Sequence, residues 1–176
     1  CMEFRVTFQN KPHTFDRQTR LRERILHTVS LDYPRSIRAG EDALKTYPDS
    51  WKLHSDLGRS YALYGDIEPA EMELLRARDM GPEMDEPLFW LLFLYDRYDI
   101  EEPDRRLDLV DEALTRHAGN GDMLMLSYEV CSRLRERSCA GRALALGHAS
   151  FPRHPKMNKY IEEYGGLDAL PPLDVP

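Results

Sequence analysis

Apolar residues recur along most of this chain with the period of an α-helix. Leu21, Ile25 and Val29 stand four residues apart, which places them in a stripe on one face of a helix. Towards the other end, the segment 155–164 collects its large apolar residues on one face in the same way. The pattern therefore predicts an all-α chain that ends in a short capping helix over 155–165, followed by an extended tail over 166–176.

The first residues follow a different pattern. Phe4, Val6 and Phe8 alternate with polar residues, which is the period of two that is typical of a β-strand. A single strand is not stable alone, so it packs against the first helices, pairs with a second copy or accepts a strand from a partner. The pattern predicts an N-terminal extension over 1–16 that contains this strand.

The most apolar stretch, Phe89 to Tyr95, predicts a helix that is apolar on every face. Such a helix has to be buried on every face, and the neighbouring helices of one chain cover only part of it. We expect the rest to be covered by a partner protein or a second copy, or else by the chain's own tail or N-terminal strand. The remaining alternative is that the register of this helix is misassigned.

A pattern of small and apolar residues recurs about every 34 residues. Alanine or glycine stands at 43, 77, 113 and 147, and proline or alanine at 48, 82, 118 and 152. Between these positions, Gly58 allows two paired helices to approach closely, and Gly65-Asp66 ends the first helix of the pair. The most complete copy consists of Leu57, Gly58, Tyr61, Gly65, Asp66, Ala70, Leu74, Ala77 and Pro82.

This pattern resembles the tetratricopeptide repeat (TPR), a helix–turn–helix unit of about 34 residues. The resemblance implies an all-α, right-handed superhelix of about four units, at 17–50, 51–84, 85–120 and 121–154. It is weakest in the first unit, where charged residues and a glycine occupy positions that the family fills with other residue types. His54 stands where the family has a bulky apolar residue.

In TPR proteins, the first helix of each repeat lines an inner, concave surface. Carried over by register, the resemblance implies a groove with large apolar residues at one end and arginines at its edge. The set of Lys, Asn and Arg with which some TPR domains hold a peptide carboxylate is absent, because Ser55, Arg59 and Trp90 occupy those places. The expected partner-binding residues are Phe89, Trp90, Phe93, Arg97, Met125, Leu126, Arg59 and Arg133.

Net charge and hydropathy exclude two classes of partner. The formal net charge is −7, so there is no overall basic field to attract nucleic acid. No apolar run approaches the roughly 18 residues that a membrane-spanning helix requires. We therefore expect neither nucleic-acid binding nor membrane insertion.

The three cysteines, Cys1, Cys131 and Cys139, form an odd set with no CxxC spacing. This pattern predicts no disulfide framework and no zinc site, and it favours a reducing cytoplasm. Cys131 is expected to be a small buried residue between helices. Cys1 precedes Met2, the expected natural start, and is either a residue left by cloning or the first residue of a mature lipoprotein.

The chain contains no recognisable catalytic, metal or cofactor motif. No pair among the six histidines has the spacing of HExxH, and no glycines form a phosphate-binding loop. The acidic segment 99–104 lacks the glycine and the alternating aspartates of a calcium loop. We expect no enzyme activity, no metal and no cofactor.

The leading hypothesis is a cytoplasmic interaction module or scaffold that binds a protein or peptide segment in an apolar groove. Two alternatives remain: a secretion-type TPR chaperone, and an assembly subunit that forms a homodimer. An enzyme or the regulatory fragment of one is the hypothesis from another class.

Overall fold

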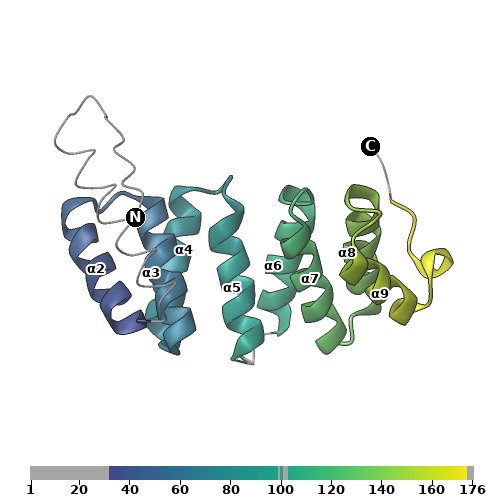
Figure 1. Ribbon diagram of the computed structural model, residues 1–176, viewed down its shortest axis with the longest axis horizontal. Helices are drawn as coiled ribbons and strands as arrows, with labels where there is room; N and C mark the ends of the chain where they lie inside the picture. Colours follow the sequence, from purple (N-terminus) through teal and green to yellow (C-terminus); the bar gives the residue numbers. More distant parts are fainter. Residues whose placement is uncertain (1–31, 99, 101–102, 174–176) are drawn as a thin grey trace, which may run out of the picture.

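The computed structural model describes residues 32–98, 100 and 103–173. Within these ranges the chain is helical and contains no β-strand. Figure 1 shows the helices lying side by side, in sequence order, along the long axis of the molecule. They are α2 (Tyr33–Thr46), α3 (Trp51–Tyr64), α4 (Ile67–Met80), α5 (Asp85–Arg97), α6 (Pro103–Arg116), α7 (Gly121–Arg133), α8 (Arg137–Ser150), α9 (Pro155–Tyr164) and the short 3-10 turn η1 (Leu167–Ala169).

The helices pack as antiparallel neighbours joined by short turns. Within this series α3 contacts α5, and α5 contacts α7, so these three helices form one layer, while α6 contacts α8 in a second layer. The starts of α3, α5, α7 and α9, at residues 51, 85, 121 and 155, are 34, 36 and 34 residues apart. The division of the chain into four repeat units stays a prediction, as does the hand of the superhelix.

Polar side chains cap the starts of several helices, because the first N–H groups of a helix have no partner within it. The side chain of Ser50 accepts a hydrogen bond from the backbone N–H of Leu53 at the start of α3. Asn120 accepts one from the N–H of Met123 at the start of α7 in the same way. These caps fix where α3 and α7 begin and therefore which of their side chains face the neighbouring helices.

A close approach between α3 and α4 depends on Gly58. A β-carbon placed there would lie 2.6 Å from Cγ of Leu74 and 3.1 Å from the carbonyl oxygen of Ala70. Both Leu74 and Ala70 are fully buried. The glycine of the repeat pattern is therefore required by packing between helices and not by a special backbone conformation.

A polar pair lies inside the second helical hairpin. His54 is 2% exposed, and its Nδ1 lies 2.5 Å from Oε2 of Glu73, on α4. Its Nε2 lies 2.8 Å from the carbonyl oxygen of Pro48, in the turn before α3. The TPR resemblance implies an apolar residue at this position, but the histidine is buried here with partners for both of its ring nitrogens.

The expected strand and the first part of the first unit lie outside the described residues. At the other end, α9 covers the segment expected to form a capping helix, and the tail expected to be extended contains η1. Pro171 of this tail lies against α8, because a β-carbon on Gly141 would be 2.8 Å from its Cδ.

Replacing Gly58 by alanine tests the close approach. We expect Gly58→Ala to lower the free energy of unfolding by about 1–3 kcal/mol, because the added methyl group overpacks the α3–α4 contact. Gly119→Ala is the matched control, since a β-carbon at Gly119 meets no atom within 4 Å. Urea unfolding of both variants measures the difference, and equal stabilities would contradict the assigned packing.

Candidate protein-binding face

The helix α5 is covered on all but one of its faces. Five of its apolar side chains are at most 1% exposed, namely Leu88, Leu91, Leu92, Leu94 and Tyr95. Phe89, Trp90 and Phe93 pack against this core but remain partly exposed. We call these three residues the aromatic face. The structure therefore confirms a helix with apolar residues all round and shows which of them the described chain leaves partly open.

The rings of the aromatic face are packed edge to face. The Phe89 and Trp90 centroids lie 5.5 Å apart at an interplanar angle of 86°, and the Trp90 and Phe93 centroids lie 5.1 Å apart at 72°. This geometry is favourable for aromatic pairs, and the Trp90 ring packs against both phenylalanine rings. From α3, the guanidinium carbon of Arg59 lies 5.4 Å from the centroid of the Trp90 ring, within the range of a cation–π contact.

The other expected binding residues lie on α5 and α7 and differ in exposure. Met125 and Leu126, on α7, are each 9% exposed and therefore belong mostly to the core. Arg97 is exposed at the end of α5, and Arg133 of α7 forms an ion pair with Asp96 of α5. The structure thus brings Arg59 against the aromatic face, whereas Met125 and Leu126 contribute little open surface.

Ion pairs connect each helix of this layer to the next, a feature that the sequence analysis missed. Lys52 of α3 pairs with Glu86 of α5, and Lys156 of α9 donates a hydrogen bond of 2.9 Å to Glu129 of α7. Lys52 and Glu86 are 34 residues apart, so they occupy the same place in successive repeats. The opposite charges of Lys52 and Glu86, one repeat length apart in the sequence, could have predicted this ion pair.

Two carboxylates of this layer have shifted pKa values. Burial raises the pKa of Asp96, and its ion pair with Arg133 opposes that shift only in part. Burial also acts to raise the pKa of Glu129, but hydrogen bonds from Tyr160 and Lys156 outweigh it, so that this pKa lies below its ordinary value. Glu129 is therefore stabilised in its charged form by contacts that join α7 to α9.

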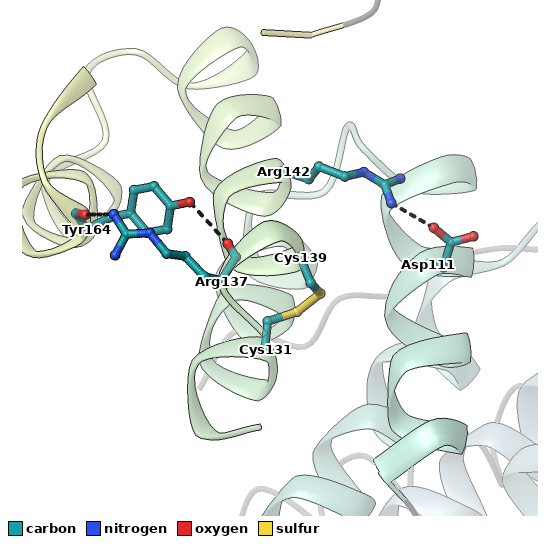
Figure 2. Close-up of a disulfide and its surroundings, with 6 residues drawn as sticks. All are labelled: Asp111, Cys131, Arg137, Cys139, Arg142 and Tyr164. Carbon is teal, nitrogen blue, oxygen red and sulfur yellow. Dashed lines mark hydrogen bonds and ion pairs between the residues drawn. A yellow bond between two sulfur atoms is a disulfide. The ribbon is translucent and has the colours of Figure 1, made fainter. Parts of the chain in front are cut away.

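A disulfide joins Cys131 of α7 to Cys139 of α8, as Figure 2 shows. The prediction of no disulfide was wrong, because the tight turn between these two helices brings the end of α7 against the first turn of α8. The two α-carbons lie 5.7 Å apart, within the usual range for a disulfide. The expected helical hairpin already implied that residues on either side of its turn lie close together. The odd number of cysteines nevertheless argued against a disulfide. Cys131 is fully buried, as expected of a residue between helices.

Polar contacts around the disulfide tie α8 to two further helices (Figure 2). Arg142 donates a hydrogen bond of 2.9 Å to Asp111 of α6. Arg137 donates one of 3.1 Å to the carbonyl oxygen of Tyr164, and the Tyr164 hydroxyl donates one of 3.1 Å to the carbonyl oxygen of Arg137. The disulfide is therefore part of a wider set of contacts that holds the C-terminal half together.

Two open clefts lie away from the aromatic face. One of about 710 Å³ lies between α4 and α6 and is lined mainly by charged residues, Arg78, Asp79, Asp108, Asp111, Glu112 and Arg116 among them. Another of about 370 Å³ lies between α6 and α8 and includes Cys139. The described residues contain no group of three histidines, cysteines or carboxylates suited to hold a metal ion. Nor does any helix in the described ranges have the length and apolar character to cross a membrane.

Removing the disulfide should destabilise the fold measurably. We expect Cys131→Ser/Cys139→Ser to lower the free energy of unfolding by about 2–3 kcal/mol, because a short closed loop no longer restricts the unfolded chain. Urea unfolding measures this loss, and the same loss is expected for wild type in dithiothreitol. A thiol assay in denaturant provides the control: of the three cysteines, one should react before reduction and all three after it. Three reactive thiols without reductant would contradict the disulfide.

Acid should weaken the contact between α7 and α9. Because the folded-state pKa of Glu129 lies below its ordinary value of 4.5, its stabilising contribution is present above that pH and is lost as the pH falls through the lowered value. We expect wild type to be more stable than Glu129→Gln at neutral pH and the difference to shrink below the ordinary value. Thermal melts across the acidic range measure it, and a difference that stays constant with pH would contradict this assignment.

Comparisons with known proteins support the fold assignment. No protein-family model matches the chain, and no match was found among curated protein sequences. Among solved structures, a crystal structure of the MamA protein is similar with a TM-score of 0.69 and 18% identity, over 84% of this chain and 80% of that one. A thermophilic TPR protein of Thermus thermophilus is similar with a TM-score of 0.67 and 19% identity, over 87% of this chain and 85% of that one. The chain therefore has the helical repeat fold of TPR proteins.

Proposed function

We propose that this protein is a protein-interaction module that binds a segment of another protein on the aromatic face of α5. The observation that carries the proposal is the contrast within one helix. Leu88, Leu91 and Leu92 are at most 1% exposed, whereas Phe89, Trp90 and Phe93 stay partly open to solvent. An apolar surface of this kind is stabilised when a partner removes it from water.

The composition of the face supports this use. Aromatic residues and arginine are enriched where protein interfaces contribute most of their binding free energy. Here three rings and Arg59 lie together on two helices that contact each other, and the edge-to-face packing already restricts the rings before any partner binds. Little side-chain entropy is then lost on binding. By analogy with TPR proteins, we expect the same residues on a concave surface, where an amphipathic helix or an extended apolar segment would fit.

The proposed function includes no catalytic activity. It differs from the sequence-based prediction in the cellular compartment. A reducing cytoplasm was predicted because the cysteine pattern indicated no disulfide, and the structure contains one. The disulfide between Cys131 and Cys139 favours an oxidising compartment instead.

A second candidate is a homodimer that covers the aromatic face with a second copy. The same partly open apolar residues favour it, because either occupant would remove them from water. The two candidates differ in the mass of the isolated protein in solution. A chaperone for apolar protein segments is a special case of the first candidate.

A double substitution on the aromatic face tests the proposal. We expect Trp90→Ala/Phe93→Ala to keep the circular dichroism spectrum of the folded protein but to lose a protein that wild type captures from a lysate of the native host. Met72→Ala is the matched control, because Met72 is an apolar side chain of α4, 57% exposed. We expect it to retain the captured protein.

Light scattering on all three proteins separates the two candidates. An unchanged mass together with loss of one captured protein supports the interaction module. A change from dimer to monomer in the double variant supports the homodimer. If all three proteins capture the same set and have the same mass, the aromatic face is not a binding surface and the proposal fails.

A further inference from the structure

The charges around the aromatic face are mostly neutralised by neighbouring helices. Lys52 is paired with Glu86, Arg133 with Asp96, and Lys156 with Glu129. Each pair joins side chains from different helices of the layer. These residues therefore present little net charge to an approaching segment.

Two arginines of α3 and α5 have no such partner. Arg59 contacts the Trp90 ring, and Arg97 stands one helical turn after Phe93 on α5. Neither forms an ion pair or hydrogen bond with another residue in the described part of the chain. A guanidinium that rests on a ring keeps N–H groups free at its edge, and those groups match the geometry of a carboxylate.

The two arginines and the three rings form one surface with apolar and cationic parts. We infer that the segment bound on the aromatic face is an amphipathic segment with acidic residues on its flank, and that its carboxylates pair with Arg59 and Arg97. This inference rests on the proposed function and specifies the chemistry of the partner.

Charge argues against a basic occupant. Three carboxylates of the same layer, Glu86, Asp96 and Glu129, already have cationic partners. A basic segment would also place its charges beside Arg59 and Arg97. The chain's own segment 1–31 contains six lysines and arginines against three aspartates and glutamates, so its charge does not complement this surface.

The net charge of −7 does not prevent an acidic segment from binding at this place. Charges separated by more than about 8–10 Å are largely screened at physiological salt. The contacts with Arg59 and Arg97 act within that distance. Ion pairs with Arg59 and Arg97 therefore determine whether an acidic or a basic segment binds more tightly.

Two designed helical peptides of about 18 residues test the inference. They share one stripe of leucine and phenylalanine at positions i, i+3, i+4 and i+7, and differ only in carrying glutamates or lysines beside it. The chain has two tryptophans, so a Trp51→Phe background leaves Trp90 as the only tryptophan reporter. Fluorescence titration then gives the dissociation constant of each peptide at this face.

We expect the glutamate peptide to bind about tenfold more tightly than the lysine peptide at low salt, since two exposed ion pairs together contribute about that factor. Arg59→Glu/Arg97→Glu should reverse the preference, and Arg97→Glu alone, which leaves the contact between Arg59 and Trp90 in place, should reduce it. Arg76→Glu is the matched control, because Arg76 is an exposed arginine of α4, and should leave the preference unchanged.

The outcomes separate the inference from the function on which it rests. If both peptides bind with equal affinity, the inference is wrong while the aromatic face remains a binding surface. If neither peptide changes Trp90 fluorescence at about 1 mM, both the inference and the proposed function fail. If light scattering shows a dimer that Arg59→Glu/Arg97→Glu converts to a monomer, a second copy is the occupant and the inference is overturned.

Discussion

The structure depends on the burial of each helix by its neighbours in the chain. A helical hairpin cannot bury its own apolar surface, so each pair relies on the next one for a continuous core. The helix α5 shows the limit of this arrangement. Its leucines are covered by α4, α6, α3 and α7, but Phe89, Trp90 and Phe93 remain partly exposed. The candidate binding face is therefore the part of this apolar helix that its neighbours leave partly exposed.

Two kinds of contact set how firmly that face is held. Ion pairs such as Lys52 with Glu86 join successive helices of the same layer, and the disulfide between Cys131 and Cys139 joins the two helices of one hairpin. The ion pairs are partly exposed and sensitive to salt and pH, whereas the disulfide is covalent. A surface for binding benefits from both, because rings held in place lose less entropy when a partner covers them.

The all-helical repeat fold was predictable because its signals are local or periodic. Gly58 and Ala70 mark a close helix crossing, and the α3–α4 contact that the structure shows is the one this pattern predicts. The run of apolar residues likewise identified α5 as a helix that is apolar on every face. The disulfide was missed because cysteine counting ignores which residues a turn brings together. The histidine inside the second hairpin departs from the family pattern, and only the positions of Glu73 and Pro48 explain it.

The sequence alone determined that this chain forms helical hairpins and which helix is apolar on every face. Apolar periods and small residues are patterns along the chain, so they can be read without coordinates. Only the tertiary structure decided that Met125 and Leu126 are mostly buried while Trp90 stays partly open, and that Arg133 is paired while Arg59 and Arg97 are not. Exposure and pairing depend on side chains from several helices meeting in space, and no local pattern contains that information.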